Sequence, residues 1–289
     1  MGWTAAAPPQ PLEGGWDNHL WRFSTADGRS HVLRMYRGYG PVATAKAANE
    51  AAAMECARHA GLAVPANEAV GDVDGVPVFI QQLMPGVPVV DAVKRRPWQL
   101  ASLARQFGAM QARIHSIPPP STVRRLGVGE IRTTIDDGPL AEALAREARI
   151  DTFCHLDYHP LNVLACGGTL TAVLDWPGAA VTDRRADLAF TETALLRIPL
   201  PPSPINALLN RVRRRLHHHW REGYRAEAGE FPLSPLFQAA SVVSYISDLE
   251  AAVREGRGWA TEADVITMRS EQQRLMKAAG LMRMGPPPP

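Results

Sequence analysis

The sequence predicts an α+β fold of two lobes, with a small antiparallel sheet in the N-terminal lobe and mostly helices in a larger C-terminal lobe. Three observations predict it. The first 84 residues contain short β-forming runs separated by Asp-Gly turns. Residues 84–88, Met-Pro-Gly-Val-Pro, interrupt every regular pattern. Beyond them, apolar residues recur at helical spacing. We therefore expect a lobe at residues 1–84, a hinge at about 83–88 and a second lobe at 85–289.

Two β-rich runs within residues 19–36 flank the pair Asp27-Gly28, which is the pattern of a hairpin. An alanine-rich stretch at 44–60 has high helix propensity throughout. A second Asp-Gly pair precedes the run at 76–83, whose valine, phenylalanine and isoleucine residues predict another strand. The first lobe should therefore be a sheet with one helix inserted.

Residues 98–117 place apolar side chains at helical spacing and are followed by three prolines, so a helix is expected to end there. The stretch 162–176 is an exception, because two β-forming runs around Gly167-Gly168 predict a short hairpin. The prolines at the end of the chain predict a disordered tail at 285–289. Three further helices are expected at about 203–226, 232–255 and 260–281.

Composition excludes several classes of protein. The chain has 31 basic and 29 acidic residues and a net charge of +2, which argues against broad electrostatic attraction to nucleic acid or membrane. Three cysteines without a CxxC pair do not indicate a disulfide framework. No apolar run approaches the ~20 residues that a membrane span needs. We expect a cytoplasmic protein with a small-molecule partner, and its oligomeric state stays open.

The candidate chemistry lies between residues 155 and 175. His155 is followed by Asp157 and Asn162, and a hairpin then leads to Asp175. A carboxylate can orient an attacking hydroxyl and accept its proton, while an amide and a second carboxylate offer the oxygen ligands that Mg²⁺ prefers. Because the hairpin folds the chain back, residues 13 apart can face one metal ion. His155 and His159 are interpreted as loop residues satisfied by backbone hydrogen bonds.

This segment resembles the catalytic segment of the aminoglycoside phosphotransferase and choline kinase family, small-molecule kinases related to protein kinases. The resemblance extends from about Leu12 to Leu196 and includes a closing acidic segment at 183–189. It implies a bilobal protein-kinase-like fold, ATP and Mg²⁺ as cofactors and a small-molecule hydroxyl acceptor. It further implies that Asp157 is the catalytic base, that Asn162 and Asp175 are Mg²⁺ ligands, and that His155 and Asp187 give structural support.

The resemblance also implies a nucleotide site in the first lobe. Arg34 stands where protein kinases have a lysine, and its fork geometry differs from that of lysine. Glu50 is the carboxylate expected to pair with Arg34, with Glu55 as a competitor. Lys46 lies four residues before Glu50 on the same helix, so a surface ion pair between these two residues is also expected.

Four further residues complete the nucleotide site that the resemblance implies. Gly14 and Gly15 lie where the family turns its first two strands over the phosphates, and glycines there allow close approach of the backbone. Leu83 and Met84 lie at the hinge, where backbone groups would hydrogen-bond adenine. Whether ATP or GTP is preferred stays open.

The tract at 211–221 contains five arginines and three histidines, which suggests a nucleic-acid patch or a metal site. Periodicity argues against both. Apolar residues recur every fourth position from Leu208 to Tyr224 and predict one buried helix face, so the arginines should lie mainly on the solvated side. Consecutive histidines on a helix point in different directions and cannot all bind one metal ion.

The function predicted from the sequence is ATP- and Mg²⁺-dependent phosphorylation of a hydroxyl group of a small molecule. The alternative is a catalytically silent nucleotide-binding module, which only the replacement of lysine by Arg34 favours. Residues 188–289 carry a net charge of +3, which does not favour a polycationic acceptor. An antibiotic, an amino alcohol and a sugar stay open. Candidate acceptor contacts are Glu192, Trp220, Tyr224, Tyr245 and Asp248.

Overall fold

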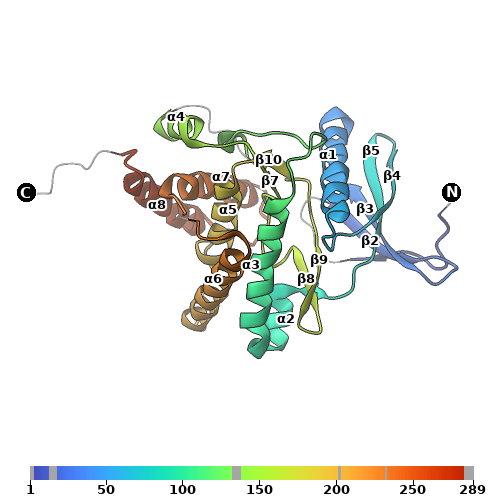
Figure 1. Cartoon of the computed structure of the whole chain (residues 1–289). Coiled ribbons are helices and arrows are strands. Elements are labelled where there is room, and N and C mark those ends of the chain that lie inside the picture. Colours follow the sequence, from blue (N-terminus) through green and yellow to red (C-terminus); the bar gives the residue numbers. More distant parts are fainter. Residues whose placement is uncertain (1–2, 13–17, 132–137, 201–202, 232, 283–289) are drawn as a thin grey trace, which may run out of the picture.

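The computed structural model describes residues 3–12, 18–131, 138–200, 203–231 and 233–282. Its N-terminal part is a five-stranded antiparallel sheet with the strand order β1-β2-β3-β5-β4, covered by helix α1 (Figure 1). The predicted α+β class is confirmed. The elements of this part are β1 (Gln10–Pro11), β2 (Asn18–Ser24), β3 (Ser30–Tyr36), α1 (Gly40–His59), β4 (Asn67–Val73) and β5 (Val76–Gln82).

The predicted hairpin around Asp27-Gly28 is formed by β2 and β3. The predicted helix is confirmed as α1, but it begins at Gly40 because Pro41 fits the first turn of a helix, where no backbone N–H is needed. Strand β4 was not predicted. Most of its side chains are exposed at the edge of the sheet, so it lacks the alternation of a half-buried strand.

The chain crosses between the two parts just after β5. The next strand, β6 (Val87–Pro88), pairs with a hairpin of the second part. Gly86 has a φ of +118°, and a Cβ atom at this position would lie 2.7 Å from the carbonyl oxygen of Ala165. Glycine is therefore required here for two reasons, the positive φ and the close approach of the hairpin backbone.

The second part is mostly helical, and α3 and α6 lie side by side in it (Figure 1). Their backbones touch at two glycines. A Cβ atom on Gly108 of α3 would lie 1.9 Å from the oxygen of Trp220, and one on Gly223 of α6 would lie 1.9 Å from the oxygen of Arg105. The helices are α2 (Val89–Arg95), α3 (Leu100–Ser116), α4 (Gly138–Glu147), α5 (Arg184–Leu196), α6 (Asn206–Ala228), α7 (Pro235–Arg254) and α8 (Glu262–Ala278), with short 3₁₀ turns η1 (Pro97–Gln99) and η2 (Val128–Glu130).

Short strands occupy the middle of the second part. The predicted hairpin is confirmed as β8 (Val163–Cys166) and β9 (Thr169–Val173). Strands β7 (Thr152–Cys154) and β10 (Ala180–Thr182) form a separate antiparallel pair that was not predicted. Each has only three residues, too few to show a period.

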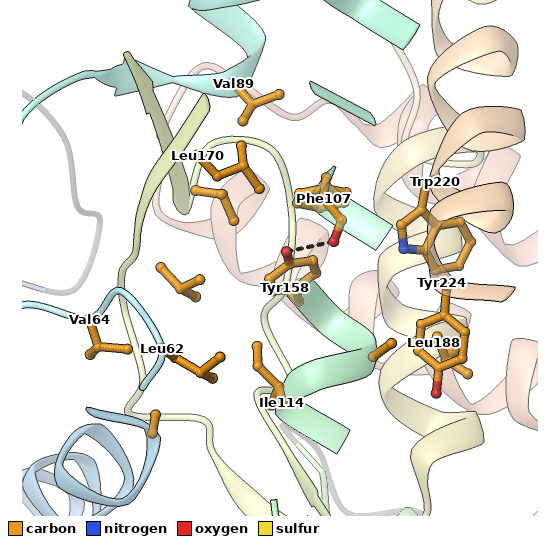
Figure 2. Close-up of a cluster of buried hydrophobic side chains, with 14 of the residues drawn as sticks. Leu62, Val64, Val89, Phe107, Ile114, Tyr158, Leu170, Leu188, Trp220 and Tyr224 are labelled. Carbon is orange, nitrogen blue, oxygen red and sulfur yellow. Dashed lines mark hydrogen bonds between the residues drawn. The ribbon is translucent and has the colours of Figure 1, made fainter. Parts of the chain in front are cut away.

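One buried cluster connects the two parts. It extends from the end of α1 and the segment after it, through the strands, to α3 and α6. Figure 2 shows Leu62 and Val64 on one side of this cluster and Trp220 and Tyr224 on the other. Tyr158 lies in the middle, stacks on Phe107 and donates its hydroxyl to the Phe107 carbonyl oxygen at 2.8 Å. The loop that carries Asp157 is thereby anchored to α3.

The helix α6 contains the arginine-rich tract. Its predicted apolar face is confirmed from Leu216 onward, since Leu216, Trp220 and Tyr224 are buried, whereas Leu208 is exposed. Arg211, Arg214 and Arg215 are exposed, as expected of the solvated side. Among the helices of the described segments, none is long and apolar enough to span a membrane.

Candidate active site

The predicted catalytic segment begins directly after β7 and ends directly after β9. Two cross-links hold its ends together: His155 Nε2 is 3.0 Å from the carbonyl oxygen of Leu174, and the Leu174 N–H donates to the carbonyl oxygen of Asn162 at 2.8 Å. Asp157, Asn162 and Asp175 are therefore gathered at one end of the β8–β9 hairpin. Leu156 and Asp175 have φ values of 62° and 63°, a strained conformation for a non-glycine residue that is common at functional sites.

His155 is fully buried and is satisfied by the backbone, as predicted. Its Nδ1 accepts the N–H of Asp157 at 3.2 Å, while its Nε2 contacts Leu174. Burial lowers the pKa of His155, which favours the neutral ring. A neutral ring with its proton on Nε2 fits both contacts.

Asp157 is partly exposed and is held by Asn162. The Asn162 amide group donates to Asp157 Oδ2 at 2.9 Å and to the Asp157 carbonyl oxygen at 3.0 Å. The interpretation of His159 as a backbone-bonded loop residue is wrong, because its Nε2 instead lies 3.5 Å from Asp157 Oδ1 and 3.2 Å from the Asn162 amide nitrogen. The side chains of Asp157, His159 and Asn162 thus orient one another.

Asp187 lies beneath this loop on α5 and is fully buried. Its Oδ1 accepts the N–H of Leu156 at 2.6 Å, and its Oδ2 accepts Gln111 Nε2 at 3.0 Å and lies 2.8 Å from His115 Nε2. Burial alone would raise the pKa of Asp187, but the contacts with His115 and Gln111 outweigh it and hold this pKa below its usual value. A charged Asp187 therefore braces the backbone next to Asp157.

Gln111 and His115 were missed from the sequence. They are four residues apart on α3, and Gln111 is fully buried. The sequence did contain a signal for them, since two polar residues stand one turn apart on the apolar face of a helix. Buried polar groups need hydrogen-bond partners, so this pattern indicates a buried polar network.

The prediction that Trp220 and Tyr224 contact the acceptor is wrong. Both side chains instead extend the hydrogen-bond network of Asp187, Gln111 and His115. Trp220 Nε1 donates to Gln111 Oε1 at 2.9 Å, and the Tyr224 hydroxyl lies 2.8 Å from His115 Nδ1. Both rings are 0% exposed, so no acceptor can reach them. They belong to the core because they form the face of α6 that packs against α3.

Arg34 forms a bridge between the sheet, α1 and the catalytic segment. Its Nη1 donates to Glu50 Oε1 at 2.6 Å and its Nη2 donates to Asp175 Oδ1 at 2.8 Å. The predicted Arg34–Glu50 pair is confirmed, whereas Glu55 pairs with Arg58 on the surface. The predicted surface pair of Lys46 with Glu50 is wrong, because Glu50 faces inward and is 0% exposed.

Glu50 is held by three donors in the interior. Besides Arg34, the Tyr36 hydroxyl donates to Oε2 and the Trp176 N–H donates to Oε1. Burial raises the pKa of Glu50, and the guanidinium of Arg34 opposes that shift. The charge of Glu50 therefore depends on Arg34.

The other residues predicted for the nucleotide site belong to two segments of the chain. Leu83 and Met84 are half-buried just after β5, and the Leu83 N–H reaches the Ser30 carbonyl oxygen at 3.4 Å. Gly14 and Gly15 lie outside the residues that the structure describes.

Glu192 lies away from the catalytic loop's hydrogen bonds and joins three helices. Its oxygens contact Arg197 Nη1 at 2.9 Å and His217 Nε2 at 3.1 Å, and they accept the side-chain amide of Gln238. Burial would raise the pKa of Glu192, but these partners lower it to about 2. Tyr245 is also mostly buried, with its hydroxyl 3.5 Å from the Phe190 oxygen, and Asp248 is half-buried on α7.

A family model described as the phosphotransferase enzyme family matches residues 9–224. A search of the curated proteins found no match to this chain. Solved structures match over most of the chain. Macrolide 2'-phosphotransferase MphH from Brachybacterium faecium is 20% identical with a TM-score of 0.52, and the match covers 98% of this chain and 96% of that one.

Aminoglycoside phosphotransferase APH(3'')-Id from Streptomyces rimosus is 14% identical with a TM-score of 0.55, and the match covers 81% of this chain and 90% of that one. The same enzyme in complex with ADP and streptomycin is 14% identical with a TM-score of 0.50, and here the match covers 79% of this chain and 92% of that one. These likenesses show that the fold is that of protein-kinase-like phosphotransferases.

Proposed function

Because the chain belongs to the phosphotransferase enzyme family and is a small-molecule kinase, we propose that it transfers a phosphoryl group from ATP to a hydroxyl group, with Mg²⁺ bound at Asn162 and Asp175. The observation that carries the proposal is the arrangement at one end of the β8–β9 hairpin. There Asn162 fixes the carboxylate of Asp157 at 2.9 Å, and a backbone hydrogen bond from Leu174 joins Asn162 to the residue before Asp175.

The residues at this end of the hairpin fit a magnesium ion. Asn162 and Asp175 supply amide and carboxylate oxygens, which are hard ligands. The Asn162 amide nitrogen is used by Asp157, so the amide oxygen is the atom for a metal ion. Asp175 is 36% exposed, and Arg34 contacts its Oδ1. When bound, Mg²⁺ would neutralise charge on the phosphates.

Asp157 is proposed as the base. Its carboxylate is partly exposed, while Asn162 and the braced loop fix its direction. In phosphoryl transfer most of the rate comes from positioning and charge neutralisation, and proton acceptance contributes the smaller part. The buried hydrogen bonds of Asp187 therefore support the role of Asp157, because they fix the loop that carries it.

We place the nucleotide between the sheet lobe, residues 1–84, and the helical lobe, residues 85–289. Nucleotide use is supported by the ADP complex of the Streptomyces rimosus enzyme, whose fold this chain shares. Arg34 would face the phosphates, since it already lies on Asp175. The acceptor would enter between the catalytic loop and the C-terminal helices, because that side of Asp157 is left open by the nucleotide.

A catalytically silent nucleotide-binding module is the second candidate. Its supporting observation is the contact of Arg34 with Asp175, because a guanidinium on a metal ligand competes with the metal ion. Slow ATP hydrolysis measured with and without Mg²⁺ separates the two candidates. An active kinase hydrolyses ATP only with Mg²⁺, and a silent module hydrolyses none.

The experiment that tests the proposed function is Asp157→Asn. The variant should fold, bind ATP with Mg²⁺ and lose phosphoryl transfer by about 100 to 10,000-fold, since an amide cannot accept the proton. Asp72→Asn, an exposed aspartate on β4, is the matched control and should keep wild-type activity. Near wild-type turnover of Asp157→Asn would contradict the assignment.

A further inference from the structure

The carboxylate of Glu50 is shared between two side chains of β3. Arg34 Nη1 donates to its Oε1 at 2.6 Å, and the Tyr36 hydroxyl donates to its Oε2. Arg34 and Tyr36 are two residues apart on the strand, so their side chains lie on the same face of the sheet. Both residues are 5% exposed and Glu50 is 0% exposed, so water does not compete with these donors.

The second arm of the Arg34 guanidinium points to the catalytic segment. Its Nη2 donates to Asp175 Oδ1 at 2.8 Å, and in the proposed function this arm faces the phosphates. A guanidinium frequently pairs with a carboxylate through two parallel hydrogen bonds, one to each oxygen. Because the Tyr36 hydroxyl holds Oε2 of Glu50, Arg34 pairs with Glu50 through Nη1, and Nη2 is kept for Asp175.

We propose that Tyr36 is a positioning residue for phosphoryl transfer. Its hydroxyl holds Oε2 of Glu50 and so prevents a two-armed pair between Glu50 and Arg34. Nη2 of Arg34 is thereby kept at Asp175 and at the phosphates. The inference rests on the proposed function and adds a residue to it. A lysine at position 34 would have a single ammonium group and no second arm to lose, so Tyr36 is needed because an arginine stands there.

The substitution Tyr36→Phe removes the hydroxyl and keeps the ring. The ring packs edge-on against Phe79, with 5.6 Å between the centroids, and its centroid lies 5.4 Å from Arg34 Cζ. Both contacts persist in the variant, so the protein should fold. Oε2 of Glu50 then lacks this donor, and a buried acceptor without a partner is costly. Arg34 can supply the donor by turning Nη2 to Oε2, which takes Nη2 away from Asp175.

The first test is the crystal structure of Tyr36→Phe beside that of the wild type, both without nucleotide. In the variant, both arms of Arg34 should hydrogen-bond Glu50, and Nη2 should lie beyond hydrogen-bond distance of Asp175. In the wild type, Nη2 should lie on Asp175. The proposal is overturned if Nη2 stays on Asp175 in the variant.

The second test is the affinity for MgATP, measured by calorimetry on the full chain. Tyr36→Phe should weaken binding about tenfold, because Nη2 no longer makes a charge-assisted contact with the phosphates. In the Arg34→Lys background the same substitution should weaken binding by less than about twofold, because lysine has no second arm. Ser244→Ala is the control: it removes a buried hydroxyl that donates to the Ile131 carbonyl oxygen at 3.1 Å, and it should keep the wild-type affinity.

Each result of the second test decides. An equal loss of affinity in the arginine and lysine backgrounds would show that the Tyr36 hydroxyl acts only on the fold. No loss in the arginine background, or no binding of MgATP by the wild type, also overturns the proposal. Neither test depends on turnover, so the proposed function fails separately, when Asp157→Asn keeps wild-type activity.

Discussion

Removing Arg34 should destabilise the protein, because Arg34 is the cation that pairs with the buried Glu50. In Arg34→Ala, Glu50 loses its cation while remaining 0% exposed, and leaving one partner of a buried pair alone costs about 3–5 kcal/mol. The contact with Asp175, which is 36% exposed, adds little because water screens it. Arg34→Lys keeps the charge, but its ammonium is a compact point charge in place of the fork that holds both carboxylates. The loss of one charge-assisted hydrogen bond is worth about 1.5–3 kcal/mol.

Urea unfolding of the full chain measures these differences. The free energy of unfolding should decrease in the order wild type, Arg34→Lys, Arg34→Ala, and phosphoryl transfer should follow the same order because the alanine variant also removes the charge opposite the phosphates. Arg96→Ala, at an exposed arginine, is the control and should change stability by less than about 0.5 kcal/mol. The reasoning is refuted if Arg34→Ala unfolds at the wild-type urea concentration, or if Arg34→Lys is the less stable variant.

Three further changes test other parts of the structure. Asp175→Ala should weaken Mg²⁺-dependent nucleotide binding in calorimetry, and an unchanged affinity would exclude it as a metal ligand. Glu192 has a lowered pKa of about 2, so its stabilisation, on the order of 3 kcal/mol, is present above about pH 4.5 and is lost as the pH falls toward 2. Urea unfolding of Glu192→Gln should lack that acid dependence, and a wild-type pH profile would count against the ion pair. Gly223→Ala should lower the free energy of unfolding in urea by about 1–3 kcal/mol or more, because its Cβ would lie 1.9 Å from the Arg105 oxygen. Gly71→Ala is the control and should change this free energy little, because its Cβ meets no atom within 4 Å. Equal stability of the two variants would show that α3 and α6 separate easily.

The part of the site that could be predicted from the sequence is local. Asp157, Asn162 and Asp175 lie within 19 residues, and one hairpin brings them together, so residue type and spacing were sufficient. The Arg34–Glu50 pair spans only 16 residues and followed from the resemblance. Strands β2, β3 and β5 and the long helices were also predicted from local signals, since turn residues, helix propensity and apolar spacing are visible within one segment.

Contacts between distant segments were not predictable. Gln111 lies 76 residues from Asp187, and nothing in either segment indicates the other. The wrong prediction that Trp220 and Tyr224 contact the acceptor has a related cause. Apolar residues on one face of a helix indicate that this face is buried, but they do not indicate which element buries it. Here that element is α3, and only the tertiary fold brings it there. Strand β4 was missed because an exposed edge strand carries little hydrophobic alternation.

The arginine at position 34 also decides which chemical probes can detect this protein. Reagents that acylate an amine near bound nucleotide phosphates require a lysine there, and a guanidinium, which stays protonated, is a poor nucleophile. The chain has only three lysines, Lys46, Lys94 and Lys277. Among them, Lys46 lines a hollow that the segment after β3, the first turns of α1 and Arg257 form together. An acyl-phosphate derivative of ATP should therefore leave position 34 unmodified, and any label found on Lys46 would report a reagent that had reached the hollow.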